Sequence, residues 1–248
     1  MGRLGLRRTW IALAGGAVLA LLTAGLLPSV AAAPTSVYVV QGLPGRTVSV
    51  SVDGKTVVEH LAGGKVAGPF LVKRGTRTVT VTEGEETLMA SKVTLPAGSN
   101  SEIVVHLPAS PSGDPMITRF DNNLQDVRSG RAAHSVAHVA AAGPIDVRVN
   151  GNVVSANVAN GEYTYQVMPA GRRSVDIVPA AMTEPLLGPF DQTLAAGKMT
   201  WVFVVGVPGR DLGIVRHVID LAENKVSKRP DEVRTGTGGQ AAELATSE

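Results

Sequence analysis

An internal repeat is the feature of this sequence that most constrains its fold. Residues 39–54 align with residues 136–151 at a constant offset of 97, and the alignment continues to Gly64 and Gly161. After one deletion the alignment resumes, and it pairs 75–79 with 171–175 and 94–98 with 193–197. Solenoid repeats have periods of roughly 20–50 residues, so a period of this length indicates two duplicated domains.

Each copy has the pattern of short β-strands. Apolar residues alternate with polar ones over 47–52 and 145–149, which is the period of a strand with one buried face. Asp53-Gly54 and Asn150-Gly151 follow these runs, and such pairs favour two-residue hairpin turns. Further strands are expected at 76–82, 87–95, 101–107, 173–178, 190–195 and 199–205. The sequence therefore predicts an all-β fold with two tandem immunoglobulin-like β-sandwich modules of about seven or eight short strands each.

The repeat also indicates the secondary structure of two ambiguous segments. Residues 132–142 are rich in alanine and favour a helix by propensity alone, but their counterpart at 37–40 is strand-like. Because duplicated domains share a fold, we expect a strand. An offset of 99 places 116–120 on 215–219, which predicts a closing strand after the proline- and glycine-rich loop at 108–115.

The N-terminal segment is typical of a secretory signal peptide. Three arginines precede an uncharged apolar run of 17 residues at 11–27, and small residues follow at 31–33. We expect cleavage after Ala32; the alternative is an uncleaved membrane anchor, because 17 apolar residues are at the lower limit for spanning a bilayer. The protein is therefore expected to be secreted, extracellular or cell-wall associated, with membrane contact only through the signal segment of the precursor.

The repeat and the shifts in composition divide the chain into parts. The predicted parts are a signal-peptide helix at 1–33, a first β-sandwich module at 34–121, a linker at 122–130, a second β-sandwich module at 131–221 and a disordered tail at 222–248. Without the signal segment the chain has 20 basic and 21 acidic residues, so it lacks the basic surface with which proteins bind nucleic acid. The absence of cysteine excludes disulfides, thiolate zinc sites, iron–sulfur clusters and thiol nucleophiles.

Motifs of the second copy resemble those of a secreted domain family, domain of unknown function 4397 (DUF4397). The family pattern is a strand that ends in His-Ala-Ser-Pro, then Val-Asp-Val-Tyr-Val-Asp-Gly, and later Val-Pro-Ala-Gly. In this chain the corresponding residues are His138, Ile145–Gly151 and Met168–Gly171.

The first copy departs from this pattern. Gln41 stands where the family has the histidine, Ser49 where it has the aspartate, and residues 73–75 read Lys-Arg-Gly in place of Pro-Ala-Gly. The resemblance covers about residues 36–221 in two copies. It implies a fold and a secreted setting, and it implies no chemistry because the family has no established activity.

Histidines are the first candidates for chemistry. His134 and His138 would share one face of a helix and chelate a metal there, but in a strand they lie roughly 13 Å apart, too far for one ion. His138 with Asp146 and Ser135 would suggest nucleophilic catalysis, but the sequence has no Gly-x-Ser-x-Gly elbow and the first copy lacks the histidine and the aspartate. We therefore predict no catalytic residue, no cofactor and no metal site.

Two tyrosines are the main candidates for binding. Tyr163 and Tyr165 are two residues apart and share a strand face, where they would form a stacking platform for sugar rings. Ordinary sheet packing uses the same arrangement. With His138 at the rim of its module, these tyrosines are the predicted ligand-binding residues, and the expected partner is a cell-wall glycan or an envelope protein.

The sequence thus predicts a secreted, non-catalytic binding or adhesion module of the cell envelope. Duplication suits binding, because two tethered weak sites bind more tightly than one. One alternative is a rigid structural spacer without a ligand site, and another is an unrecognised extracellular hydrolase built on Asp146 and Glu162. A contiguous exposed aromatic patch would favour binding over the spacer.

Overall fold

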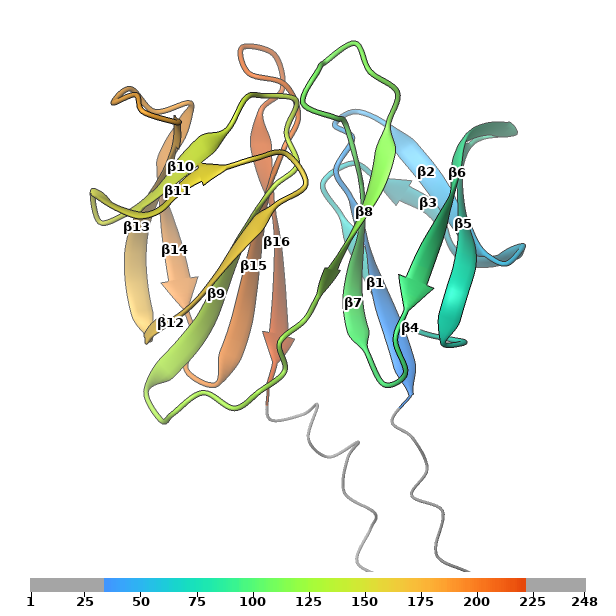
Figure 1. The fold of residues 1–248 in the computed structure, drawn as a ribbon, viewed down its shortest axis with the longest axis horizontal. Coiled ribbons are helices and arrows are strands. Elements are labelled where there is room, and N and C mark those ends of the chain that lie inside the picture. The colour runs from blue at the N-terminus through green and yellow to red at the C-terminus, as the bar shows by residue number, and fades with distance from the viewer. Residues whose placement is uncertain (1–33, 222–248) are drawn as a thin grey trace, which may run out of the picture. The chain divides into compact units, whose positions relative to one another are not determined.

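Residues 34–221 are described by a computed structural model, and they form sixteen strands and no helix (Figure 1). Within residues 34–221 the structure contains no helix that could span a membrane. The signal-peptide helix predicted at 1–33 and the tail predicted at 222–248 lie outside the described residues.

Eight strands belong to each half of the described chain. The first module contains β1 (Thr35–Gln41), β2 (Thr47–Val52), β3 (Lys55–Ala62), β4 (Val66–Val72), β5 (Gly75–Glu83), β6 (Glu86–Leu95), β7 (Asn100–His106) and β8 (Met116–Asp121). The second module contains β9 (Arg131–His138), β10 (Ile145–Val149), β11 (Asn152–Val158), β12 (Tyr163–Pro169), β13 (Gly171–Pro179), β14 (Leu187–Leu194), β15 (Lys198–Val205) and β16 (Gly213–Asp220). Residues 122–130 connect β8 to β9.

The two modules have the same sheet topology. In the first module the sheets have the orders β3-β2-β5-β6 and β4-β1-β7-β8, and in the second they have the orders β11-β10-β13-β14 and β12-β9-β15-β16. In each module the first and seventh strands pair in parallel, and the other pairs are antiparallel. The prediction of two tandem β-sandwich modules is confirmed.

The repeat extends to the hydrogen bonds of the hairpin turns. Asp53 and Asn150 have φ angles of 49° and 51°, and each is followed by a glycine that also has a positive φ. The side chain of Asp53 accepts a hydrogen bond from the Thr78 amide at 2.9 Å, and that of Asn150 accepts one from the Ser174 amide at 3.0 Å. The turn residue thus fixes its hairpin to the neighbouring strand in both modules.

The alanine-rich segment is a strand, as the repeat predicts. β9 pairs with β12 on one side and with β15 on the other, and every residue after Arg131 is buried. Small side chains suit this position because both faces of the strand are covered. Tertiary packing therefore overrides the helix propensity of alanine.

The closing strand is confirmed, but its predicted alignment is wrong by two residues. The strand ladders place Phe120 opposite Glu102, and His217 opposite Trp201. Glu102 and Trp201 occupy equivalent positions, because they pair in parallel with equivalent residues of β1 and β9. Phe120 therefore corresponds to His217 and not to Ile219. The loop before the closing strand is two residues shorter in the second module, and an even difference leaves each side chain on the same face.

Each sandwich has its own apolar core. In the first module the fully buried members are mainly valines from both sheets: Val37, Val39, Val48, Val50, Val79, Val81, Ile103 and Val105. In the second module they are Val136, Ala140, Ile145, Val147, Val175, Ile177, Val202 and Val204.

A third apolar cluster, the inter-module core, contains residues of both modules. The first module contributes Val40, Val104 and Phe120, and the second contributes Ala133, Ala137, Val139, Met199, Trp201, Phe203, Val205, Val215, Ile219 and Leu221. The ring of Phe120 lies 5.8 Å from that of Trp201 and 6.3 Å from that of Phe203. One sheet of each module is thus covered on both faces, which explains why β7 is buried along its whole length.

Polar side chains also join the modules. The Trp201 indole N–H donates to Asn122 Oδ1 at 2.5 Å, and Asn122 Nδ2 donates to Glu102 Oε1 at 2.9 Å. His217 Nδ1 lies 2.9 Å from the same Glu102 oxygen, and the His217 ring packs against Tyr38 with 4.2 Å between centroids. Glu102 is fully buried. Hydrogen bonds through a buried carboxylate therefore join the modules in addition to the apolar packing.

Candidate functional site

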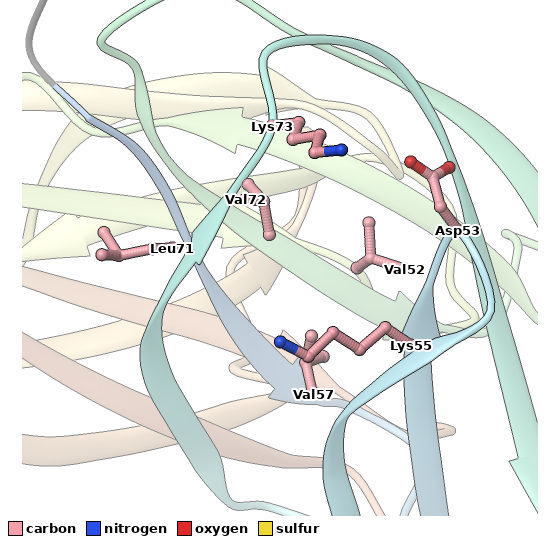
Figure 2. Close-up of a pocket in the computed structure, with 7 residues that line it drawn as sticks. All are labelled: Val52, Asp53, Lys55, Val57, Leu71, Val72 and Lys73. Carbon is pink, nitrogen blue, oxygen red and sulfur yellow. The ribbon is translucent and has the colours of Figure 1, made fainter.

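The candidate site is an open pocket in the first module, at the seam between its two sheets. β3 and β4 are edge strands, one from each sheet, and their adjoining ends enclose a cavity of about 310 Å³ (Figure 2). We call it the seam pocket, and its lining residues are Val52, Asp53, Lys55, Val57, Leu71, Val72 and Lys73.

Local structure explains how these residues meet. The tight turn at Asp53 reverses the chain between β2 and β3, so Val52 and Lys55 lie directly opposite each other. β4 ends at Val72, and Lys73 follows it. Figure 2 shows Val52 and Val72 between the two lysines and Val57 beside Lys55, whereas Leu71 projects to the other side of β4. The pocket thus has an aliphatic floor with charged groups at its rim.

The charges at the rim are not balanced. Lys55 and Lys73 are exposed, and neither side chain forms a hydrogen bond or ion pair with any residue in the described range 34–221. Asp53 instead contacts two residues of β5: its carboxylate lies 3.0 Å from Arg77 Nη1 and accepts a hydrogen bond from the Thr78 amide. The Thr78 amide and the Arg77 guanidinium lower the pKa of Asp53. The seam pocket therefore presents two lysine ammonium groups without a direct ion-pair partner among residues 34–221, and the Asp53 carboxylate attracts Lys73 at longer range.

A β-bulge shapes the wall of the pocket. Val37 of β1 lies opposite Phe70, but Val39 lies opposite Ala67, so β4 contains one extra residue. Gly68 lies in this bulge with a φ of +131°, and a Cβ there would be 2.9 Å from the Val37 carbonyl oxygen. The equivalent pairing of β12 with β9 is regular. The single deletion in the sequence alignment therefore corresponds to this bulge. The bulge changes the direction of the end of β4 that lines the pocket.

In the second module a side chain bridges the same seam. Gln166 Nε2 donates to the Val154 carbonyl oxygen at 2.8 Å and to Ser155 Oγ at 3.3 Å, which links β12 to β11. Val154 is the counterpart of the pocket residue Val57, and Gln166 is the counterpart of Phe70. Phe70 packs against the core of the first module instead. The seam is thus bridged in one module and open in the other.

The two lysines of the seam occur only in the first module. The counterparts of Lys55 and Lys73 are Asn152 and Pro169. Arg173, the counterpart of Arg77, donates to the Pro169 carbonyl oxygen at 2.8 Å. The second module therefore lacks the two lysines at this place, its arginine is held by a backbone carbonyl, and Gln166 bridges its seam.

The structure buries His138, one of the three predicted ligand-binding residues. Its Nε2 lies 3.0 Å from the Gly143 carbonyl oxygen and donates to it, and burial lowers the pKa of this imidazole. His134 is buried in the same strand, and burial lowers its pKa to about 4. Both histidines are neutral interior groups at pH 7, and neither reaches the surface.

The two predicted tyrosines lie against the inter-module core. The ring of Tyr163 is 5.5 Å from that of Phe120 and 5.3 Å from that of Trp201, while Tyr165 is half-buried against the same cluster. Tyr163 is 44% exposed, and no other aromatic side chain among residues 34–221 is exposed. The described surface therefore has no contiguous aromatic patch.

The two acidic residues of the hydrolase alternative each accept a hydrogen bond from a nearby backbone amide. Asp146 Oδ1 accepts the Asn157 amide at 2.8 Å, and Glu162 Oε2 accepts the Ala159 amide at 2.9 Å. Within residues 34–221 no group of three or more metal-ligating side chains occurs. Sequence reasoning did not identify the seam pocket, although the replacement of Pro-Ala-Gly by Lys-Arg-Gly at 73–75 was its signal.

Comparison with known proteins gives a family and a distant structural likeness. Residues 35–148 match a family described as a domain of unknown function, DUF4397. No curated protein matches the sequence. Among solved structures, a candidate cell adhesion protein from Bacteroides uniformis is 10% identical with a TM-score of 0.26, and the alignment covers 76% of this chain and 98% of that protein.

Proposed function

Residues 35–148 match the DUF4397 family, and we propose that the chain is a secreted, non-catalytic binding or adhesion module of the cell envelope. We further propose that it binds through the seam pocket. The single observation that supports this is the pair of lysines, Lys55 and Lys73, that lie above an aliphatic floor and have no direct ion-pair partner among residues 34–221. The typical signal peptide in the sequence supports the location.

The composition of the pocket favours binding over catalysis. Its titratable side chains are Lys55, Lys73 and Asp53, and the Asp53 carboxylate is held by Arg77 and the Thr78 amide. A general base must reach the proton that it removes, and a nucleophile needs a base beside it. These residues supply charge and apolar surface, which is what a recognition site requires.

The inter-module core supports a second candidate function, the rigid spacer. Trp201 and Phe120 are buried where the modules meet, and Asn122 links Trp201 to Glu102. Such a contact resists bending between the modules. A spacer would need this core and would have no use for the seam pocket, so the two functions depend on different residues.

Co-sedimentation with insoluble cell envelopes tests the proposed function. The exported chain is mixed with envelopes of the cells that produce it, alongside the double variant Lys55→Asn, Lys73→Gln. The matched control is Lys92→Asn, which removes a positive charge from an exposed position of β6 in the same module. We expect the wild-type chain and the control to sediment, and we expect the double variant to lose at least fivefold in the sedimented fraction.

Two results would contradict the proposal. Either the wild-type chain stays in the supernatant, or the double variant sediments as well as the control. The second result would leave the rigid spacer as the better description.

A further inference from the structure

We infer that the seam pocket binds an acidic amphiphile, a molecule in which a phosphate or carboxylate group is joined to a hydrocarbon part. This inference rests on the proposed function and names the class of ligand. The acidic group would lie between Lys55 and Lys73, and the hydrocarbon part would cover Val52, Val57 and Val72.

The charges of the pocket select the acidic group. Lys55 begins β3 and Lys73 follows β4, so the two ammonium groups come from opposite walls of the seam. Arg77 offsets the negative charge of Asp53, and Arg74 adds a further exposed cation beside Lys73. An ammonium group is a strongly hydrated point charge that pairs with a compact anion such as phosphate or carboxylate.

The floor of the pocket selects the hydrocarbon part. Val52, Val57 and Val72 are half-buried, so each retains apolar surface that a ligand can remove from water. A purely hydrophilic anion would leave this apolar surface exposed to water. The lining contains no aromatic side chain, and sugar rings are recognised mainly by stacking on aromatic faces. The pocket therefore fits an alkyl chain better than a glycan.

The dimensions of the pocket favour a single small molecule. Ligand pockets are typically about 300–1,000 Å³, and the seam pocket, at about 310 Å³, is at the lower end of this range. That volume accommodates one head group with a short length of chain. Because the second module has Asn152, Pro169 and the bridging Gln166 at the equivalent positions, we expect one ligand per chain.

Titration calorimetry of the purified chain with decyl phosphate, below its micelle concentration, tests the inference. We expect one saturable site, with inorganic phosphate and decyl maltoside each binding at least tenfold more weakly. The double variant Lys55→Asn, Lys73→Gln should bind decyl phosphate at least tenfold more weakly, while Lys92→Asn should stay within twofold of the wild-type chain.

Vesicles distinguish the two sources of such a ligand. Lysine-dependent binding to phosphatidylcholine vesicles that contain phosphatidylglycerol, and not to pure phosphatidylcholine, would identify a lipid head group in a bilayer. Binding of decyl phosphate without vesicle binding would identify a soluble amphiphile. Both results support the inferred chemistry.

The inference is wrong if decyl maltoside binds as tightly as decyl phosphate, or if the lysine substitutions leave decyl phosphate binding unchanged. If envelope co-sedimentation depends on the two lysines while decyl phosphate does not bind, the ligand class is wrong and the proposed function stands. If neither assay depends on the lysines, both fail.

Discussion

The two modules have the same sheet topology. They differ at the seam between the two sheets of each module. His60 and Asn157 are equivalent residues with φ angles of 52° and 57°. The amide of His60 donates to Ser49 Oγ, and the amide of Asn157 donates to Asp146 Oδ1. The side chain changed at this position, but the hydrogen bond that stabilises the irregular strand is present in both copies.

The seam shows the opposite behaviour. Phe70 and Gln166 are equivalent, yet one packs into its core while the other bridges two strands. Lys55 and Lys73 have uncharged counterparts in the second module. The two modules thus retain the residues that build the sandwich, whereas the residues of the seam have diverged. The open, cationic seam of the first module is therefore the place to look for function.

The largest effect is expected at the contact between the modules. Trp201→Ala removes a fully buried ring that packs against Phe120 and Phe203. Such truncations cost about 3–5 kcal/mol, and we expect that loss in the free energy of unfolding. Circular dichroism in urea measures it. The control Val218→Ala alters a half-exposed side chain of β16 and should change stability by less than about 0.5 kcal/mol. A loss below about 1 kcal/mol for Trp201→Ala would mean that the inter-module core contributes little.

The next effect concerns a histidine that only the second module has. His134 is buried where the first module has Val37, and burial lowers its pKa from 6.5 to about 4. The unfolded chain takes up a proton below pH 6.5, so the stability that the neutral ring supports is complete above pH 6.5 and is lost as the pH falls toward 4.

His134→Val should therefore flatten the acid side of the stability profile. Relative to its effect at pH 8, we expect the substitution to stabilise the chain by up to about 3 kcal/mol at pH 4. Urea unfolding from pH 8 to pH 4 measures the difference. Parallel profiles for the wild-type chain and the variant would show that His134 does not titrate on unfolding.

A transfer of the seam residues tests whether they suffice for binding. Asn152→Lys and Pro169→Lys supply the two charges, and Gln166→Phe removes the bridge between β11 and β12. We expect the triple variant to bind two molecules of decyl phosphate per chain. Without Gln166→Phe we expect one molecule per chain, because the seam stays bridged. A triple variant that still binds one molecule would show that the bulge at Gly68 is also required.

The smallest effect, a change in ligand affinity, is expected at Asp53, the turn residue between β2 and β3. Asp53→Asn copies the second module, where Asn150 makes the equivalent hydrogen bond to the next strand, so the hairpin should persist. The substitution removes the one negative charge at the pocket rim. Because exposed charges interact weakly, we expect decyl phosphate to bind about two- to threefold more tightly. Weaker binding by this variant would contradict the electrostatic account.

Much of the fold could be predicted because the repeat supplies what single-residue propensities do not. The strand at 131–138 was predicted against an alanine-rich composition, since its counterpart in the first copy is rich in valine. The offset of the closing strand was wrong, because the length of the preceding loop leaves no trace in the strand pattern. Trp201 and Phe203 lie on one face of β15, and that face lies against the other module.

The seam pocket could not be predicted from the sequence, for a physical reason. Its opening depends on where one side chain packs, and Phe70 and Gln166 are each compatible with an edge strand. Residue type and spacing predict Tyr163, Tyr165 and His138 as binding residues, but they do not reveal that the two tyrosines lie on the face covered by the first module or that His138 is buried inside its own module. The divergence at Lys73-Arg74 was visible, but only the structure shows that it borders a cavity.

Hydrogen–deuterium exchange with and without decyl phosphate tests the central claim, that the first module alone carries the binding site. We predict slower exchange around residues 52–57 and 71–75, where the seam pocket lies, and unchanged exchange at their counterparts 149–154 and 167–171. Equal protection in the two modules, or protection only in the second, would contradict the account.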